Sequence, residues 1–310
     1  MRVLVSIAGG LGNQIQMTAA ARTLHERLGW DIEFIAGGAP VAAQEMRDLL
    51  PFPAHRPNWS PREDDLTGAD YDGVVALGFG ANKQVQAAGW RGIRFLNTLA
   101  NQAVVYQHHS EVDISMNACR ELGVAEDDLI WHGALKYNET YAERFDVVCA
   151  NGYYRKKGGH WDVKGFPGFS SVANEVQRRH PELSVCCIGA TKEEYIHGTV
   201  DRTGLSLRDS MALIARAQLV IGTDSMAWHA AGALGVKAIG LFTATSTLKN
   251  ADPLFHYNGR VVGRLDLECR RMCQEQAHRW LRCERRECQE IGVYAAADAA
   301  DLRLKGVEGE

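Results

Sequence analysis

Residues 217–245, AQLVIGTDSMAWHAAGALGVKAIGLFTAT, decide the fold that the sequence predicts. The run Leu219–Ile221 is apolar and β-branched, which is typical of a strand buried on both faces of a sheet. The segment Met226–Leu234 is rich in alanine and ends at Gly235, so we expect a short helix that lies close to the sheet. Val236–Phe242 then has the pattern of the next strand. The stretch therefore predicts a strand–helix–strand unit of a parallel α/β sheet.

Three polar residues occupy the turn and the first helical turn of this unit. Asp224 and Ser225 stand where a helix N-cap belongs, and His229 lies four residues after Ser225. Because residues i and i+4 share a helix face, Ser225 and His229 both face the carboxyl end of the strand, where open α/β sheets bind ligands. A helix N-terminus also favours an anion. A simple cap and a structural histidine are the alternative interpretation, but the combination favours an anion-binding site.

The run Asp224–Thr245, DSMAWHAAGALGVKAIGLFTAT, resembles the C-terminal signature of glycosyltransferase family 9, the ADP-heptose:lipopolysaccharide heptosyltransferase family. Thr203–Arg208 and Met211–Ala217 are similar to the sequence of the family before that strand. The resemblance is good over about residues 145–290 and weaker in the N-terminal half. It departs at three positions where the family usually has glycine, proline and glycine, namely Met226, Lys237 and Thr243.

The resemblance implies an α/β fold of the GT-B type, in which two Rossmann-like domains face a cleft. It also implies a glycosyltransferase that moves a sugar from a nucleotide-diphosphate sugar to a hydroxyl acceptor in the synthesis of lipopolysaccharide or another surface glycan. Inversion at the anomeric carbon is expected from the family. Such enzymes need no bound divalent metal for catalysis, and no D-x-D motif is placed to supply one. The three departures alter the loop around the donor, so the donor sugar and its base stay open.

The bulk composition bounds the class of protein. The 310 residues suit two domains of ordinary size, and a hydrophobic content of 46% is ordinary for a globular protein. The net charge of -4 gives no global basic field, so nucleic acid is not an expected partner, although a local basic patch stays open. No apolar run approaches the roughly 20 residues of a membrane span. We expect a cytoplasmic protein for which peripheral contact with a membrane stays open.

Strand-like and helix-like segments alternate along both halves of the chain, which predicts mostly parallel sheets covered by helices. We expect an N-terminal Rossmann-like acceptor domain over 1–142 and a C-terminal Rossmann-like donor domain over 143–290. A helical tail over 291–310 is expected, by the same resemblance, to cross back onto the first domain. The further strands are expected at Val3–Ile7, Asp31–Ala36, Gly73–Leu77, Ala103–Tyr106, Phe145–Ala150 and Leu183–Ile188. The further helices are expected at Gln14–Leu28, Ile114–Leu122, Phe169–Arg178, Leu207–Ala215 and Tyr294–Leu304.

A glycine-rich loop, Gly9–Gln14 (GGLGNQ), joins the first predicted strand to the first predicted helix. Glycines allow a sharp turn and a close approach to a ligand, and the following helix N-terminus can face an anion or a sugar hydroxyl. Gly10, Gly12 and Gln14 are therefore candidate ligand-binding residues, with a tight connection as the alternative. The longer string GGLGNQIQ is similar to the start of family 11 fucosyltransferases, but the H-x-R-x-x-D motif of that family is missing.

The residue that follows these glycines bears on proton transfer. By the resemblance to family 9, Asn13 stands where the family has an aspartate that is taken as the general base for the acceptor hydroxyl. An amide cannot accept that proton at ordinary pH. Either the reaction needs little help from a base, or another group supplies it, and the candidates are His108, His109 and Glu111. Each of these three also suits a surface or structural role, and we keep Asn13 and His109 as catalytic candidates.

The donor site is expected to combine three segments of the second half. The resemblance favours Lys164, which would neutralise the leaving group, because a lysine just before a pair like Phe166-Pro167 recurs in the family and contacts phosphate. The basic triplet Arg155–Lys157 suits a diphosphate and a solvated surface loop equally well. The nucleotide base is expected near Asp201–Leu205. The candidate catalytic and donor-binding residues of this half are Asp224, His229, Lys164, Thr203, Gly204, Ser225 and Met226.

Four of the eight cysteines lie close together near the C-terminus, at Cys269, Cys273, Cys283 and Cys288. Thiolates at such spacing can close a tetrahedral Zn²⁺ site, and His278 lies between the two pairs. The spacing is wider than the C-x2-C of common zinc ribbons, and a cytoplasmic protein rarely holds disulfides. A structural zinc site and unmodified thiols are the two leading interpretations, with disulfides or an iron–sulfur cluster behind them.

Three other functions fit the same fold. A sugar-nucleotide epimerase would bind the donor but need no acceptor. A transferase of this type could also act on DNA or on a protein. The third function is a nucleotide- or glycan-binding protein without catalysis. Asn13 and Met226, which depart from the family pattern, are the reason to consider it. Replacing Asp224 and His229 separates these ideas, because binding falls in all of them but only an enzyme has turnover to lose.

Overall fold

The computed structural model describes residues 1–7, 9–36, 46–53, 71–78, 94–97, 109–152, 162–191, 195–269 and 283–306. The chain divides into two compact units, Met1–Lys136 and Tyr137–Glu310. In both units parallel strands alternate with helices, so the predicted α/β class is confirmed. Within the described ranges no helix is long and apolar enough to cross a membrane. The strand predicted at Ala103–Tyr106 lies outside the described residues.

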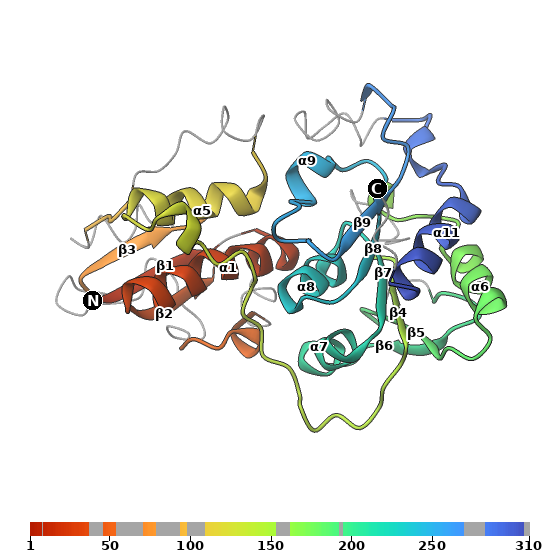
Figure 1. The fold of residues 1–310 in the computed structure, drawn as a ribbon, viewed down its shortest axis with the longest axis horizontal. Helices are drawn as coiled ribbons and strands as arrows, with labels where there is room; N and C mark the ends of the chain where they lie inside the picture. Colours follow the sequence, from red (N-terminus) through yellow and green to blue (C-terminus); the bar gives the residue numbers. More distant parts are fainter. Residues whose placement is uncertain are drawn as a thin grey trace. The chain divides into compact units, whose positions relative to one another are not determined.

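The first unit contains a small parallel sheet and two long helices. Its elements are β1 (Arg2–Ile7), α1 (Leu11–Leu28), β2 (Asp31–Ala36), β3 (Gly73–Ala76), α5 (Glu111–Glu121) and η1 (Glu126–Asp128). The strands pair in the order β2-β1-β3, and the central strand β1 is buried from Val3 to Ile7. Helices α1 and α5 pack against each other, and α1 also packs against the sheet (Figure 1).

The second unit contains a six-stranded parallel sheet. Its elements are β4 (Val147–Ala150), η2 (Asp162–Lys164), α6 (Phe169–Arg179), β5 (Val185–Gly189), β6 (Val200–Thr203), α7 (Leu207–Arg216), β7 (Leu219–Thr223), α8 (Met226–Leu234), β8 (Ala238–Leu241), α9 (Thr247–Asn250), β9 (Gly259–Val262), η4 (Glu287–Gln289) and α11 (Val293–Leu304). The strands pair in the order β6-β5-β4-β7-β8-β9. The unit thus repeats the strand–helix alternation that the sequence predicts.

Helices cover both faces of the second sheet (Figure 1). α6 and α11 pack together on one face, where alternate strand residues such as Cys149, Ile221 and Ile239 form a core with them. α8 packs against β7 and β8 on the other face, next to α7. A parallel strand covered on both sides needs apolar residues at successive positions, which is the pattern of Leu219–Ile221.

The C-terminal helix α11 covers the sheet of its own unit. It packs on α6 and contacts β7, β8 and β9, and its residues Ala296 and Ala300 are fully buried. Arg179 of α6 lies 2.7 Å from a carboxylate oxygen of both Asp298 and Asp301. The helix predicted for the tail is thus present and covers the second sheet, and its contact with the first domain stays a prediction. Its alanine-rich face is flat enough to lie directly on the second sheet.

The strand order of the second sheet reverses between β4 and β7. The chain runs outward from β4 through β5 to β6, returns to pair β7 with β4, and continues outward through β8 to β9. This is the Rossmann order of an open, doubly wound sheet. The carboxyl ends of β4 and β7 are therefore the place where such sheets bind ligands.

Two strands and one α-helix of the second unit were not predicted, namely β6, β9 and α9. Both strands lie at the edges of the sheet, and neither is fully buried, so VDRT and GRVV lack the apolar run of a central strand. α9 has only four residues, which is too short for a helical period to show in the sequence.

Candidate functional site

The ends of β4 and β7 bring a glycine and a short polar turn together. Thr223 closes β7, and its hydroxyl donates to the carbonyl of Gly152 at 3.4 Å. A Cβ on Gly152 would lie 2.6 Å from the Cβ of Ser225, so the approach requires a glycine. Asp224 and Ser225 are only 3% and 8% exposed. The switch point of the sheet therefore carries two of the candidate residues from the sequence signature.

The carboxylate of Asp224 is the centre of a buried polar network. Nζ of Lys164 lies 3.3 Å from its Oδ2, and Nδ2 of Asn250 donates to the same oxygen at 3.1 Å. Nε2 of His229 lies 3.1 Å from Oδ1. The structure thus brings Lys164 to Asp224 and His229, although Lys164 lies 60 residues before Asp224 in the sequence. It adds Asn250, which sequence analysis missed.

Asp224 stays ionised in this environment. Burial by itself raises the pKa of a carboxyl group, because it disfavours the charged form. The positive charge of Lys164, the hydrogen bond with His229 and a contribution from Thr245 outweigh burial and hold the pKa of Asp224 well below its usual range. The carboxylate is therefore a fixed negative charge, which positions Lys164 and His229 and is a poor acceptor for a proton.

Two polar side chains hold residues 163–166, the segment at the end of η2 that is called the Lys164 loop below. The side-chain amide of Asn151 donates to the carbonyl of Phe166 and accepts from its N–H, both at 2.9 Å. The hydroxyl of Thr243 lies 2.7 Å and 2.9 Å from the carbonyl oxygens of Val163 and Lys164. The glycine that family 9 usually has at this position has no hydroxyl to offer. The departure at Thr243 therefore anchors the Lys164 loop to the end of β8.

The other two departures from the family pattern have different surroundings. Nζ of Lys237 donates to the carbonyl of Arg303 at 3.1 Å, near the end of α11, where a lysine can satisfy a terminal carbonyl. Met226 is the half-buried first residue of α8. Lys237 therefore ties a loop to the C-terminal helix, whereas Met226 stands at the helix start beside Ser225.

The N-terminus of α8 lacks a side-chain cap. Ser225 occupies the N-cap position, but its hydroxyl makes no hydrogen bond to the first turn. The hydroxyl oxygen is buried and has no hydrogen-bond partner among the residues that the structure describes. The first N–H groups of the helix and the positive end of its dipole lie at the same place. Together with the ammonium of Lys164, these donors suit an anion such as a phosphate group.

Thr203 and Gly204 lie at the edge of the same sheet. Thr203 closes β6, and its N–H donates to the carboxylate of Asp201 at 2.8 Å. Gly204 has a φ of +78°, and its N–H donates to the carbonyl of Gly189 at 2.8 Å. β6 lies three strand positions from β7, which is about 14 Å along the sheet. These two candidates therefore share the carboxyl edge of the sheet with Asp224 but lie outside its network.

In the first unit, the side chain of Gln14 binds back to the start of the glycine-rich loop. Gly9 has a φ of +99°, which a glycine adopts without strain. Gly10 is the N-cap of α1, and the helix begins at Leu11, earlier than predicted. Gln14 is fully buried, and its Nε2 donates to the carbonyl of Gly9 at 2.9 Å. Gln14 therefore fixes the shape of the loop, while Gly10 and Gly12 contribute backbone at the helix start.

Asn13 is bound to a carboxylate that comes from another helix. Its Nδ2 donates to Oε2 of Glu111, and Nε2 of Gln16 lies 3.5 Å from the same oxygen. Glu111 is the first residue of α5, which is capped by the hydroxyl of Ser110. The carboxylate therefore lies at the N-terminal end of α5 and against the first turn of α1. Both helix dipoles favour its ionised form.

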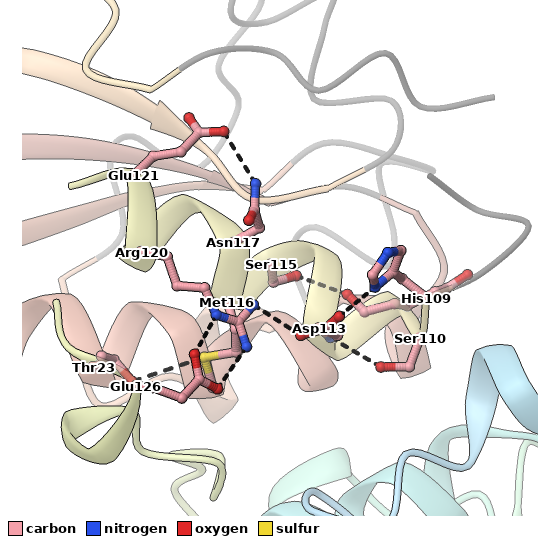
Figure 2. A network of polar contacts seen from close by, with 11 residues as sticks. Thr23, His109, Ser110, Asp113, Ser115, Met116, Asn117, Arg120, Glu121 and Glu126 are labelled. Carbon is pink, nitrogen blue, oxygen red and sulfur yellow. Dashed lines mark hydrogen bonds and ion pairs between the residues drawn. The ribbon is translucent and has the colours of Figure 1, made fainter. Parts of the chain in front are cut away.

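His109 belongs to a different network on the same helix (Figure 2). Its Nδ1 lies 2.6 Å from Oδ2 of Asp113, and Oδ1 of that carboxylate accepts from Arg120 at 2.8 Å. Arg120 also binds Glu126 of η1 at 2.6 Å. The imidazole of His109 is 51% exposed, so solvent reaches it. The network ties the start of α5 to the segment after its end, and it holds His109 in one orientation.

The end of the cysteine-rich segment supports the loop that carries Lys164. Cys288 is buried and packs in one cluster with Val163. The neighbouring Gln289 donates to the carbonyl of Gly165 at 2.8 Å. Residues on both sides of Lys164 are therefore held by a segment more than one hundred residues away in sequence.

The predicted metal site lies only partly within the described residues. Cys269 is exposed, and Cys283 is half buried. Within the described ranges no three His, Cys, Asp or Glu side chains form a group that could hold a metal ion. The candidate residues outside those ranges are Cys273, His278, His108 and Arg155–Lys157. A metal site at the four cysteines therefore stays a prediction.

Two asparagines of the site were not predicted from the sequence: Asn250 binds Asp224, and Asn151 holds the segment that carries Lys164. Asn250 lies in α9, after β8, and reaches Asp224 because β8 is the neighbour of β7 in the sheet. Asn151 lies directly after β4, on the other side of β7. No local motif marks either asparagine. Only the strand order, which pairs β7 with β4 and β8, indicates that they belong to the site.

Comparisons with known proteins agree with this arrangement. The model of the family described as glycosyltransferase family 9 (heptosyltransferase) matches residues 156–278. This range contains Lys164, Asp224 and His229 and every strand of the second sheet except β4. The resemblance that the sequence signature indicates is thereby confirmed. A search of curated proteins found no match.

Solved structures with a similar fold include a family 9 glycosyl transferase from Veillonella parvula, with a TM-score of 0.70 and 14% identity over 98% of this chain and 97% of that chain. The ADP-heptose lipopolysaccharide heptosyltransferase II of E. coli has a TM-score of 0.61 and 18% identity over 91% and 99%. The iron-containing dodecameric glycosyltransferase TibC of enterotoxigenic E. coli has a TM-score of 0.63 and 15% identity over 99% and 76%. At these identities the likeness concerns the fold alone, and it confirms the GT-B class.

Proposed function

We propose that this protein is a glycosyltransferase of family 9 that moves a sugar from a nucleotide-diphosphate sugar to a hydroxyl acceptor. The observation that carries the proposal is the buried network of Lys164, Asp224 and His229 beside the open N-terminus of α8. The Ser225 hydroxyl adds a buried donor there that has no partner among the described residues. An ammonium, a hydroxyl and a helix N-terminus are the donors that a diphosphate accepts.

The relatives indicate which donor to test first. One E. coli relative is named for ADP-heptose, and a TibC structure is a complex with ADP-D-β-D-heptose. We propose an ADP-linked sugar as the donor, with its base near Thr203 and Gly204 at the edge of the second sheet. A glycan or lipopolysaccharide would be the acceptor, with transfer in the cytoplasm and inversion at the anomeric carbon.

The chemistry requires stabilisation of the leaving group. The acceptor oxygen forms a bond to the anomeric carbon, the bond from that carbon to the diphosphate oxygen breaks, and the nucleotide diphosphate leaves with the electron pair. Lys164 and the N-terminus of α8 would stabilise the charge that develops on it. Asp224 touches neither reacting atom in this mechanism, and it would position Lys164 and His229.

We propose Glu111 as the base that takes the proton from the acceptor hydroxyl. Asn13 cannot accept a proton, but its amide holds the carboxylate of Glu111 against the glycine-rich loop. His109 is the second candidate, because it is exposed and oriented by Asp113. Substitution distinguishes the two, because the enzyme should lose most of its turnover only when the residue that takes the proton is replaced by glutamine.

A panel of ADP-, GDP-, UDP-, CMP- and dTDP-sugars tests the proposal through thermal stability, affinity and nucleotide release. We expect stabilisation by one nucleotide class and release of that nucleotide when an acceptor is supplied. Ser225→Ala should weaken donor affinity about tenfold, because one hydrogen bond to a charged group is lost. The same variant should keep or raise the Tm of the ligand-free protein, since it removes a buried hydroxyl without a partner.

Ser184→Ala is the matched control for this variant. Ser184 precedes β5 at the amino end of the sheet, and its hydroxyl donates to the carboxylate of Asp146 at 2.7 Å. Its replacement should lower Tm and leave donor affinity unchanged. Full donor affinity in Ser225→Ala, or no stabilisation by any sugar nucleotide, contradicts the proposal. Stabilisation without any nucleotide release favours a binding protein without catalysis.

We also propose that the four clustered cysteines hold a structural metal ion, with Cys288, which packs against Val163, as one of the ligands. Zinc is the metal that such thiolates commonly bind, and the TibC relative is described as iron-containing. Elemental analysis of the purified protein for zinc and iron tests this. We expect about one equivalent of one of the two metals, lost in Cys288→Ser. A protein without either metal overturns the proposal.

A further inference from the structure

Two histidines lie side by side behind the N-terminus of α8. The ring centroids of His229 and His256 are 5.3 Å apart, with an angle of 56° between the planes. His229 is on α8, and His256 lies in the segment between α9 and β9. The two residues are only 3% and 5% exposed. Neither the sequence signature nor the proposed transfer reaction assigns a role to His256.

Each imidazole has one nitrogen engaged and one without a partner. Nε2 of His229 faces the carboxylate of Asp224 at 3.1 Å, and Nδ1 of His256 faces the carbonyl of Asp252 at 3.2 Å. Both partners are acceptors, so these two nitrogens carry the hydrogen atoms. Among the described residues, Nδ1 of His229 and Nε2 of His256 have no hydrogen-bond partner, although both atoms are buried. In two neutral rings these remaining nitrogens are both acceptors.

One added proton would satisfy both of these nitrogens. A buried acceptor without a donor destabilises the protein, because it has lost water and gained nothing in return. At a centroid separation of 5.3 Å the facing edges of two imidazole rings are close enough for a single N–H···N bond. The added proton is placed on His229, whose ring faces the carboxylate of Asp224, because burial lowers the pKa of His256.

The charges around the pair set when that proton is taken up. The groups that face it are the carboxylate of Asp224 at the end of β7, the ammonium of Lys164 next to that carboxylate, and the backbone carbonyl of Asp252. Without a ligand the charge of Lys164 offsets the charge of Asp224, so little net negative charge is left to stabilise an imidazolium at His229. A diphosphate at the N-terminus of α8 adds at least two negative charges one helical turn from His229.

We propose that the His229–His256 pair takes up one proton from solvent when a diphosphate binds at the N-terminus of α8. His229 then becomes an imidazolium held between the carboxylate of Asp224 and the neutral ring of His256. The proposal rests on the diphosphate site of the proposed function and extends it. His256 is a positioning residue in this scheme, because it contacts neither the donor nor the acceptor and acts through His229.

The surroundings of His256 fix its ring for this role. It stacks on Trp228 with centroids 4.5 Å apart and an interplanar angle of 11°. The indole of Trp228 donates to the carbonyl of Asn250 at 2.9 Å, and the side chain of Asn250 donates to Asp224. A Cβ on Gly232 would lie 2.8 Å from the His256 ring, so this glycine makes room for it. A closed ring of contacts therefore leads from Asp224 through both histidines and back.

Isothermal titration with ADP and with inorganic pyrophosphate measures the predicted uptake. Titrations in two buffers with different ionisation enthalpies give the number of protons bound per ligand. We expect close to one proton near neutral pH, falling to zero at low pH, where the pair is already protonated without a ligand. Affinity should therefore rise as the pH is lowered through that window. ADP or pyrophosphate binding without any proton uptake overturns the inference.

His256→Phe keeps a ring on Trp228 but removes the acceptor for His229. We expect this variant to bind one proton fewer than the wild type and to bind ADP about tenfold more weakly near neutral pH. Subtracting the proton uptake of His256→Phe from that of the wild type also cancels the protons that the ligand itself takes up or releases. His197→Phe, elsewhere in the second unit, is the matched control and should keep the wild-type uptake. Equal uptake in wild type and His256→Phe contradicts the proposal.

Nitrogen-15 spectra of histidine-labelled wild-type protein decide the question without a substitution. In the ligand-free protein each of the two rings should show one protonated and one unprotonated nitrogen. With saturating pyrophosphate, both nitrogens of His229 should be protonated and Nε2 of His256 should stay unprotonated. Two neutral rings in the complex overturn the inference even if His256→Phe does not fold. A wild-type protein that binds neither ADP nor pyrophosphate instead refutes the proposed donor site.

Discussion

At Asp224, replacing the carboxylate by an amide leaves Lys164 and His229 without an anionic partner in a buried place. Removing one partner of a buried ion pair typically costs about 3–5 kcal/mol, because the remaining charge stays desolvated. We expect Asp224→Asn to lower the free energy of unfolding by about 3 kcal/mol in urea at neutral pH. Asp298→Asn is the control, since that carboxylate is 65% exposed and its ion pair contributes less than about 1 kcal/mol. Equal losses in the two variants contradict a buried ion-pair network.

The same carboxylate predicts how stability depends on pH. Because its partners depress the pKa of Asp224 in the folded protein, the folded state binds fewer protons than the unfolded chain in acid. This stabilisation is complete above the unfolded pKa of about 3.9 and is lost as the pH falls below it. The free energy of unfolding should therefore fall from about pH 5 to about pH 3, and less steeply in Asp224→Asn. Urea titrations at several pH values give both slopes, and parallel slopes refute the argument.

For single residues, spacing in the sequence predicts part of the site, and the pairing of strands determines which other residues reach it. Asp224 and His229 are five residues apart across a helix start, so their proximity follows from the sequence. Asn250 and His256 follow β8, and they reach the site only because β8 pairs with β7. Glu111 was a candidate from its place in the chain, but its contact with Asn13 depends on how α5 packs on α1.

At the scale of elements, α11 shows how small residues set the distance between a helix and a sheet. Ala300 is fully buried in the core that α11 shares with α6 and the strands. A leucine there has no space, and overpacking costs about 1–3 kcal/mol. We expect Ala300→Leu to lower the free energy of unfolding by that amount in urea. Ala295→Leu, on the exposed side of the same helix, should change it by less than about 0.5 kcal/mol. A neutral Ala300→Leu contradicts this packing.

Central elements could be predicted more closely than edge elements. β7 and α8 were predicted almost to their ends, because the apolar run, the N-cap position and Gly235 all agree. The start of α1 was misplaced, since Gly12 suggested a turn where the first helical turn in fact tolerates a glycine. The edge strands β6 and β9 are half exposed and leave no apolar run to recognise.

For the molecule as a whole, the proposed base and the proposed donor site belong to different units. Glu111→Gln should therefore lower kcat by about 10²- to 10⁴-fold and leave the donor Kd unchanged. Adding Asn13→Asp to that variant should restore part of the activity, because it returns a carboxylate to the same place. Initial rates and donor titrations measure both effects. Glu121→Gln, at the other end of α5, is the control and should keep full turnover.

Two results would contradict this division of labour. Full turnover in Glu111→Gln, together with a large loss of kcat in His109→Gln, assigns the proton to His109 instead. A large loss of donor affinity in Glu111→Gln shows that the residue acts on the donor site as well.

The two-unit organisation is visible in the sequence as two runs of alternating strands and helices. The sequence does not predict where the C-terminal tail lies, because an alanine-rich face fits any flat apolar surface. α11 lies on the second sheet through contacts with α6 and with β7, β8 and β9, all of them far from it in sequence.

The loop that carries Lys164 has a consequence for building hybrid enzymes. Asn151, Thr243 and Gln289 are spread over most of the second unit, yet all three hold this one loop by hydrogen bonds. A hybrid enzyme should therefore take the loop and the three residues that hold it from the same parent. A chimera that takes the loop from one parent and position 243 from another would lose the anchor and with it the placement of Lys164. Recombination between relatives should keep all four positions from a single parent and place its crossovers outside residues 151–289.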